Sequence, residues 1–197
     1  MATTTLRELN GLDRTPASLA DATLILIDYQ NTYTTGVLEL TGWESALDAA
    51  AALLARARKA GTKVIHVMND GGTGSPYDIR AEIGRIHPRV APVEGEPVVV
   101  KTAAPNAFVG TDLGEHLDAA GHKNVIIAGF MTNMCVTFTA EGAFLRGNQP
   151  TVVADACVTR PLQTEVSDVS AEQLHHSALA TIADLYGVVV ASEASLS

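Results

Sequence analysis

Short runs of β-branched residues alternate with helical stretches along most of this 197-residue chain, and this alternation constrains the fold more than any other feature. Strands that alternate with helices predict a parallel sheet covered by helices on both faces. The expected fold class is therefore α/β, with three layers and six strands. We expect these strands, all fully buried, at residues 23–27, 63–67, 98–100, 124–128, 151–154 and 188–190.

Helix signals lie between these strands. Asp112 with Glu115 is a candidate cap for one helix, and Ser170 with Gln173 has the pattern of a capping box at the start of another. Glycines follow the ends of these segments, as is common after helices. The expected helices are residues 44–60, 113–120, 135–146 and 171–186.

One domain accounts for residues 21–197, because a chain of this length builds a single core that buries about 70% of the unfolded surface. Residues 1–20, rich in Thr and Ala, are expected to form an N-terminal arm over that domain. The polar, glycine- and proline-rich residues 69–96 are too long for an ordinary connection. Such a stretch is typical of a segment that shapes a site.

The charge and the cysteine content of the chain limit the kinds of partner and the cellular location that we expect. The chain has 13 Lys and Arg against 22 Asp and Glu, a net charge of −9, which argues against binding to nucleic acid. No apolar run approaches the ~20 residues of a membrane span, and no secretory pattern opens the chain. Cys135 and Cys157 are too few for a disulfide scaffold. We expect a cytoplasmic protein with a small-molecule substrate and no nucleic-acid or membrane partner.

The carboxyl ends of the strands are where open α/β sheets bind ligands. Asp28 follows the first strand, Lys101 the third, and a turn at residues 129–135 the fourth. If the strand order is 3-2-1-4-5-6, the first and fourth strands are neighbours about 4.8 Å apart, and Lys101 lies two strands, about 10 Å, away. The long lysine side chain can bridge that gap, so the three groups can converge.

Cys135 has two interpretations from the residues alone. Thr132 or Asn133 is a plausible N-cap, which would place the thiol in a first helical turn, where a thiolate is favoured and free amides can bind an oxyanion. Alternatively, Cys135 is a small buried hydrophobe, like many intracellular cysteines.

Other candidate groups have ordinary interpretations. Cys157 is expected to pack in the core. The loop arginines would suit an anionic substrate, but nothing in the sequence selects one, and they are expected to be solvated charges. The groups read as structural or surface residues are His66, His175, His176, Arg80, Arg85 and Arg89.

Four motifs, found in order from residue 26 to residue 157, resemble the isochorismatase-like cysteine hydrolase superfamily. The resemblance extends from about Ala22 to Val190. The motifs are Leu-Ile-Asp-Tyr-Gln-Asn at 26–31, Val-Val-Lys at 99–101 with Asn-Ala-Phe at 106–108, Gly-Phe-Met-Thr-Asn-Met-Cys-Val at 129–136, and Ala-Asp-Ala-Cys at 154–157.

The resemblance implies a six-stranded parallel sheet in the order 3-2-1-4-5-6 and a catalytic triad of Asp28, Lys101 and Cys135. It also implies a non-proline cis peptide between Phe130 and Met131, with the backbone amides of Met131 and Cys135 as the oxyanion hole. Homo-oligomers, dimers or larger, are a further implication. Because Asp28 and Lys101 would cancel each other's charge at the sulfur, we expect the thiol pKa to fall below the free value of ~8.5.

Members of this superfamily cleave nicotinamide, N-carbamoylsarcosine, ureidoacrylate or biuret, while isochorismatases hydrolyse a vinyl ether. Nicotinamidases have an Asp-x-His metal motif after the second strand, where this chain has residues 66–70, His-Val-Met-Asn-Asp. We therefore expect no metal and no cofactor. Cys135 favours hydrolysis of a C–N bond in a small amide or ureide. The alternatives are vinyl-ether hydrolysis led by Asp28 and a non-catalytic binding member.

Four aromatic side chains are candidates to line the substrate pocket, although core packing would explain them equally well. They are Tyr33, Trp43, Phe108 and Phe138.

Overall fold

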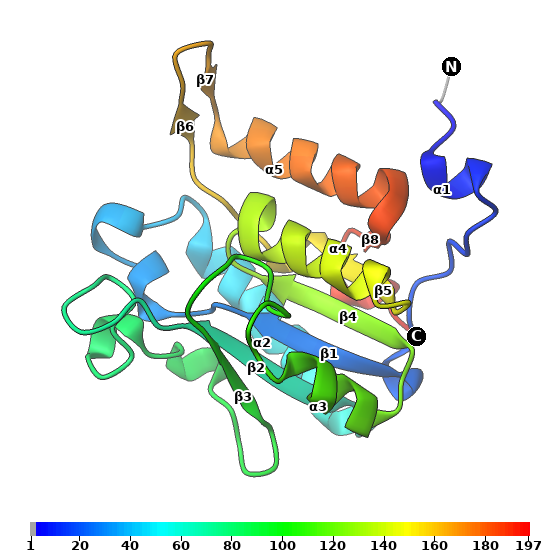
Figure 1. Ribbon diagram of the computed structural model, residues 1–197, viewed down its shortest axis with the longest axis horizontal. Helices are drawn as coiled ribbons and strands as arrows, with labels where there is room; N and C mark the ends of the chain where they lie inside the picture. The colour runs from blue at the N-terminus through cyan, green and yellow to red at the C-terminus, as the bar shows by residue number, and fades with distance from the viewer. Residues whose placement is uncertain (1–2) are drawn as a thin grey trace.

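A parallel β-sheet with helices on both faces organises the chain in the computed structural model, which describes residues 3–197 (Figure 1). All six strands of this sheet are parallel, in the order β3-β2-β1-β4-β5-β8. The last is numbered eighth because a two-stranded hairpin precedes it. The expected α/β class and strand order 3-2-1-4-5-6 are confirmed. The strands are β1 (Ala22–Ile27), β2 (Lys63–Asn69), β3 (Val98–Lys101), β4 (Asn124–Gly129), β5 (Gln149–Val153) and β8 (Val188–Val190), and the hairpin is β6 (Leu162–Gln163) with β7 (Asp168–Val169).

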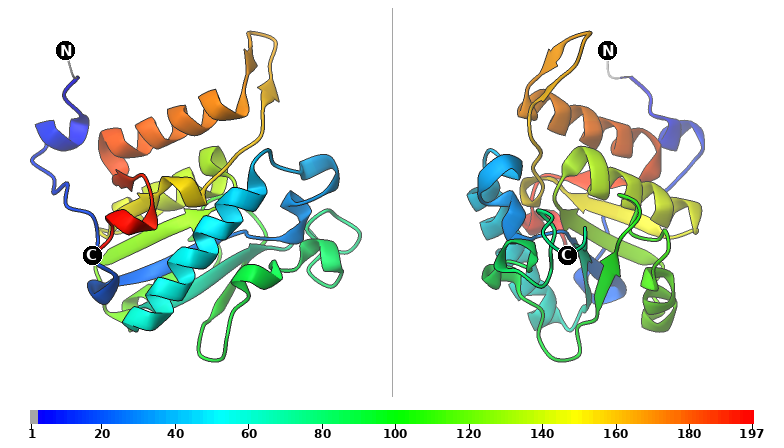
Figure 2. Two further views of the ribbon diagram at one scale, coloured as in Figure 1. Left: turned by 180° about the vertical axis from the view of Figure 1, so that it is seen from behind. Right: turned by 60° about the vertical axis from the view of Figure 1, so that its left-hand side comes forward.

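Successive side chains of β1 enter two hydrophobic clusters, because neighbouring residues of a strand point to opposite faces of the sheet. Leu24 and Leu26 pack in the cluster that includes Leu47 of α2. Ile25 and Ile27 pack in the cluster on the other face. Figure 2 shows α2 crossing the sheet on the side opposite α3 and α4. The helices are α1 (Leu6–Leu9), α2 (Trp43–Ala60), α3 (Leu113–Ala120), α4 (Thr137–Leu145) and α5 (Ala171–Thr181).

The expectation that all strands are fully buried is wrong at the sheet edges. In β3, Val98 and Val100 are 39% and 40% exposed, while Val99 between them is buried. In β8, Val188 and Val189 are only half-buried. An edge strand has a neighbour on one side only, and one face of β3 remains open to solvent. A run of valines in the sequence does not distinguish this position from a central one.

Two of the four expected helices, α2 and α3, begin and end within one residue of the expected limits. The other two are each divided between an α-helix and a π-helical turn, Thr132–Val136 before α4 and Ile182–Tyr186 after α5. Short 3₁₀ turns lie at Leu19–Asp21, Asn31–Tyr33, Gly36–Leu38, Glu82–Gly84, Pro88–Val90, Ala154–Ala156 and Glu193–Ser195.

The capping predictions have different outcomes. Ser170 and Gln173 form the expected capping box at the start of α5. Asp112 makes no capping hydrogen bond at α3, because its carboxylate lies 3.4 Å from the ring of His116 instead. The hydroxyl of Thr111 accepts the hydrogen bond from the Leu113 amide at 3.3 Å in its place.

The N-terminal arm lies against the domain in its described part, and its first two residues lie outside the described range. The buried guanidinium of Arg7 donates a hydrogen bond to the Leu185 carbonyl at 2.9 Å. The amide of Ala17 donates to the hydroxyl of Thr151, also at 2.9 Å.

None of the helices between residues 3 and 197 combines the length and the hydropathy that a membrane span requires.

Candidate active site

Three side chains meet at the carboxyl edge of the sheet, at the ends of β1, β3 and β4. Asp28 directly follows β1, Lys101 is the last residue of β3, and Cys135 lies in the turn after β4. β1 is bonded to both β2 and β4, and β3 extends the sheet beyond β2. The register places Ile27 beside Gly129 and Asn69 beside Lys101. The sheet therefore brings together the three residues that their positions at strand ends had indicated.

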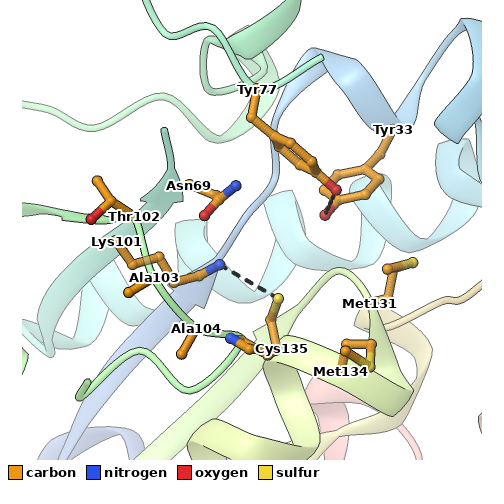
Figure 3. Close-up of a pocket in the computed structure, with 11 residues that line it drawn as sticks. Tyr33, Asn69, Tyr77, Lys101, Thr102, Ala103, Ala104, Met131, Met134 and Cys135 are labelled. Atoms are coloured by element: carbon orange, nitrogen blue, oxygen red, sulfur yellow. Dashed lines mark hydrogen bonds between the residues drawn. The ribbon is translucent and has the colours of Figure 1, made fainter. Parts of the chain in front are cut away.

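The ammonium group of Lys101 joins the other two. Its Nζ lies 2.8 Å from Oδ2 of Asp28. The same Nζ lies 3.5 Å from Sγ of Cys135 (Figure 3). Asp28, Lys101 and Cys135 are 0%, 2% and 6% exposed. A charge pair this far from water is screened weakly, so each group acts strongly on the other two.

Asp28 has an unusual backbone conformation. Its φ of 54° is the one positive value of a non-glycine residue between residues 3 and 197. The Asp28 amide donates to the Val67 carbonyl at 2.9 Å, and the Gln30 amide donates to the Asp28 carbonyl at 2.7 Å. A non-glycine residue in this region is strained and persists where its surroundings hold it. These contacts fix the backbone of Asp28 against the end of β2.

A glycine allows the turn that holds Cys135 to approach β1 closely. A Cβ atom at Gly129 would lie 2.3 Å from the Ile27 carbonyl oxygen, so any larger residue would separate the strands. The peptide bond that follows Phe130 is cis. Met131 then precedes the π-helical turn that contains Cys135.

The expected N-cap of this turn is wrong. The turn starts at Thr132, and Met131, which has no capping side chain, precedes it. The Thr132 hydroxyl is instead 2.8 Å from Nδ1 of His175, and the Asn133 side chain accepts a hydrogen bond from Thr159 at 2.6 Å. Tertiary contacts therefore use both side chains that the sequence assigned to the cap.

The structure also reverses the expected pKa of the thiol. Burial raises the pKa of Cys135 above its usual value, and the Asp28 carboxylate raises it further, while Lys101 opposes both. Burial likewise raises the pKa of Asp28, although Lys101 acts to lower it. The sequence argument omitted desolvation, which disfavours the thiolate in a site this dry. These effects favour a neutral Cys135 thiol beside the Asp28–Lys101 pair.

A pocket of about 310 Å³ opens onto the sulfur of Cys135. This volume is at the lower end of the range for sites that bind small ligands. Met131 and Met134 form part of its wall, and Tyr33 and Tyr77 form another part, with their hydroxyl groups 3.0 Å apart (Figure 3). The complete lining is Tyr33, Asn69, Tyr77, Lys101, Thr102, Ala103, Ala104, Pro105, Met131, Met134 and Cys135.

Of the four aromatic candidates, Tyr33 lines this pocket and the other three do not. Trp43 packs beside the ring of His87, with centroids 6.1 Å apart. Phe108 packs on the second hydrophobic cluster and under the Arg146 guanidinium. Phe138 is an exposed residue of α4. Core packing, the alternative stated for these residues, accounts for Trp43 and Phe108 but not for exposed Phe138.

Sequence reasoning missed Asn69, Tyr77 and the Thr102–Pro105 segment. Tyr77 belongs to the long loop at residues 69–96, whose length was the one available signal. Buried Gln30 holds this loop in place, because its side-chain amide donates to the carbonyls of Asn69 and Gly84 at 2.9 and 2.6 Å. Its oxygen accepts from the Asn69 amide at 2.8 Å.

The remaining candidates lie outside the pocket. Cys157 is buried and its thiol donates to the Val153 carbonyl at 3.3 Å. The imidazole of His66 lies 2.8 Å from the Glu96 carboxylate. Between residues 3 and 197, no three His, Cys, Asp or Glu side chains are grouped as a metal site would need.

Comparison with known proteins gives consistent matches over most of the chain. The model of the isochorismatase domain matches residues 22–194. The crystal structure of an isochorismatase from Pseudomonas putida has a TM-score of 0.95 and 39% identity, with all of both chains covered. An uncharacterised isochorismatase family protein from Bacillus subtilis is 38% identical over 88% of this chain and 97% of its own length. A secreted isochorismatase effector from Verticillium dahliae is 33% identical over 95% of this chain and 96% of its own length.

Two further relatives have names that state a reaction. A maleamate amidohydrolase from Pseudomonas putida is 33% identical over 75% of this chain and 74% of its own length. A streptothricin hydrolase from Streptomyces noursei is 35% identical over 74% of this chain, which spans about half of that relative, 53%.

Proposed function

The chain belongs to the isochorismatase family of hydrolases, and on this premise we propose that it cleaves a C–N bond of a small amide or ureide through Cys135. The observation that carries the proposal is the contact of one buried ammonium group with both the Asp28 carboxylate and the Cys135 thiol, of which the thiol lines the pocket. The amidohydrolase and hydrolase names of two relatives support this reaction class.

In the proposed mechanism, Asp28 acts as general base and Cys135 as nucleophile. Because the resting thiol is neutral, Asp28 accepts its proton as the sulfur attacks the substrate carbonyl. The backbone amides of Met131 and Cys135 donate hydrogen bonds to the tetrahedral oxyanion. Lys101 keeps Asp28 ionised before the attack and orients it.

Collapse of the tetrahedral intermediate breaks the C–N bond and leaves a thioester on Cys135. Asp28, now protonated, transfers its proton to the leaving amine. The carboxylate then accepts a proton from water, whose oxygen attacks the thioester carbonyl. The acid product leaves, and the sulfur regains a proton from Asp28. The cycle consumes one water and returns every group to its starting state.

Several finer statements belong to the same proposal. The catalytic unit is a single domain at residues 21–197 with an N-terminal arm at residues 1–20. It needs no metal or cofactor, acts on a small molecule in the cytoplasm and forms homo-oligomers. We infer these properties from the sequence and from its resemblance to the superfamily.

An ammonia-release screen over small primary amides and ureides tests the proposal, with 5 mM EDTA in a parallel series. We expect turnover of at least one compound, no effect of EDTA, and loss of turnover in Cys135→Ala or after alkylation of Cys135. Loss of turnover with EDTA that zinc or iron restores would contradict the metal-free mechanism. Hydrolysis of isochorismate that Cys135→Ala retains and Asp28→Asn loses would establish the vinyl-ether alternative. If no compound reacts, the alternative of a non-catalytic binding protein is favoured.

A further inference from the structure

The charges around the Cys135 pocket point to the kind of substrate that it accepts. We infer that the pocket selects an uncharged amide or ureide and discriminates against a substrate that carries a carboxylate. This inference rests on the proposed function and names the substrate class of the same site.

Within the lining, the one cationic group is already neutralised. Lys101 is the only charged residue among the residues that line the pocket, and its Nζ is 2.8 Å from Oδ2 of Asp28. The pair therefore presents no net charge to a ligand. Much of the rest of the wall is apolar, formed by Ala103, Ala104, Pro105, Met131 and Met134.

The arginines of the loop at residues 69–96 are also engaged by carboxylates. Arg80 donates to both oxygens of Asp70, at 2.8 and 2.9 Å, and to Asp78 at 2.6 Å. Arg85 pairs with Glu82, and Arg89 pairs with Asp48. Each loop arginine that was a candidate to bind an anionic substrate therefore already has a carboxylate of this chain as its partner.

The polar groups that remain in the wall suit a neutral amide. Asn69 presents a side-chain carboxamide, which both donates and accepts hydrogen bonds. The hydroxyl groups of Tyr33 and Tyr77 are 3.0 Å apart, so one donates to the other and the second hydroxyl hydrogen is left for a ligand. An amide or ureide has both donors and acceptors to match this set, whereas a carboxylate has acceptors alone.

A carboxylate would lose its hydration on entering this pocket without gaining a cationic partner, and such burial is costly. The net charge of −9 adds a repulsive field at long range. The same two effects leave a neutral ligand unaffected. We therefore expect a neutral ligand to enter more readily than an anionic ligand of the same size.

Two alkylating reagents of nearly equal size test this inference on the sulfur itself. Iodoacetamide is neutral and iodoacetate is anionic. With either reagent, the thiolate forms an S–C bond as the C–I bond breaks and iodide leaves. The rate constants for Cys135 are measured by peptide mass spectrometry in the Cys157→Ala protein. The ratio of the iodoacetamide rate to the iodoacetate rate is divided by the same ratio for 2-mercaptoethanol. We expect this normalised preference to be about 10-fold or more. A value of one or less would overturn the inference.

A charge placed at the pocket mouth provides the matched comparison. Ala103 is exposed and lines the pocket, so Ala103→Arg adds a cation without replacing a core residue. We expect Ala103→Arg to reduce the preference for iodoacetamide by about 5-fold or more and the polar but uncharged Ala103→Gln to leave it nearly unchanged. An equal effect of the two substitutions would show that charge does not control entry.

Turnover separates this inference from the proposed function. Succinamide has two neutral amide groups, whereas succinamate has a carboxylate in place of one of them. Under the inference, succinamide, or the neutral member of another such pair in the ammonia screen, has the higher kcat/KM. Preferential hydrolysis of the acid would overturn the inference and leave the proposed function intact. If no amide reacts, the proposed function fails, and the alkylation ratio still decides the charge preference.

Discussion

Two buried cysteines of this chain differ in what surrounds the sulfur. Cys135 is 6% exposed and lines a pocket, whereas Cys157 is 2% exposed and donates to the Val153 carbonyl. Burial raises the pKa of both thiols, that of Cys157 to about 12, so acidity does not favour either strongly. Access should decide reactivity.

We therefore predict that iodoacetamide modifies Cys135 first and that the modification abolishes turnover. Tryptic mapping at increasing times measures this order. Cys157→Ala serves as the control and should retain both labelling and activity. Faster labelling of Cys157, or normal turnover of Cys135→Ala, would contradict the role of Cys135.

Lys101 provides the second prediction at this scale. Burial raises the pKa of Asp28 and Lys101 lowers it, so Lys101→Met removes the main group that opposes the effect of burial. The carboxylate then binds its proton at higher pH, and the acid limb of kcat/KM moves to higher pH. The pH profile of Cys135 alkylation should also move upward, because Lys101 acts to lower the thiol pKa.

Turnover of Lys101→Met at neutral pH should fall by about 100-fold or more, as expected when a positioned acid-base function is lost. Exposed Lys59 of α2 gives the matched control, because Lys59→Met removes the same charge far from the pocket. Near-normal turnover together with an unchanged alkylation profile in Lys101→Met would exclude Lys101 from the site.

The strand ends predicted that Asp28, Lys101 and Cys135 can converge, because the carboxyl ends of parallel strands share one edge of the sheet. The resemblance to the superfamily was needed to combine them as a triad. The sequence was not sufficient for the thiol pKa, since desolvation depends on how completely the surrounding loops cover the sulfur. The place of Tyr77 in the pocket could not be predicted for a related reason. Its position depends on the path of a long loop, which the tertiary hydrogen bonds of Gln30 determine.

At the scale of elements, a charged cluster joins α2, β2 and the segment before β3. Glu96 accepts hydrogen bonds from Arg58 and from His66, each at 2.8 Å. Burial acts to raise the pKa of Glu96, but the hydrogen bonds from Arg58, His66 and the Val93 amide outweigh it and lower the pKa to about 2. A carboxyl group with a lowered folded-state pKa stabilises the fold above its unfolded value, here 4.5, and loses that contribution as the pH falls toward 2.

Glu96→Gln should accordingly lower the free energy of unfolding by about 1–3 kcal/mol at pH 7, and the difference from wild type should shrink at pH 3. Urea titrations at the two pH values measure both quantities. Exposed Glu94 lies on the same loop, and Glu94→Gln should change stability little. A loss for Glu96→Gln that is equally large at pH 3 would show that the carboxylate charge is not what stabilises the cluster.

Elements with strong local signals were predictable. The Ser170–Gln173 capping box and the glycine-ended α2 follow from short-range hydrogen bonds and backbone freedom that the local sequence determines. The turn at Thr132–Val136 was not, because its polar side chains bond to His175 and Thr159 from distant segments. The exposed face of β3 also depends on its place at the sheet edge rather than on its own residues.

At the scale of the whole molecule, the strand order followed from the resemblance to a known superfamily and agrees with the parallel pairing in the structure. Assembly is a separate question. The family resemblance implies homo-oligomers, and exposed apolar side chains such as Leu145 and Val166 offer surface to cover. Light scattering at micromolar concentration should give a mass of at least two chains, and a mass of about 20.6 kDa would contradict the prediction.

The central claim is that a covalent thioester forms on Cys135 during hydrolysis of a C–N bond. The most direct test is rapid acid quenching of the enzyme during turnover of the best substrate from the ammonia screen, followed by intact and peptide mass spectrometry. The account predicts that the protein gains the mass of the acyl group, that the gain maps to the peptide containing Cys135, and that Cys135→Ala shows neither the gain nor turnover. Steady turnover with no acyl adduct at any quench time, retained in Cys135→Ala, would contradict it.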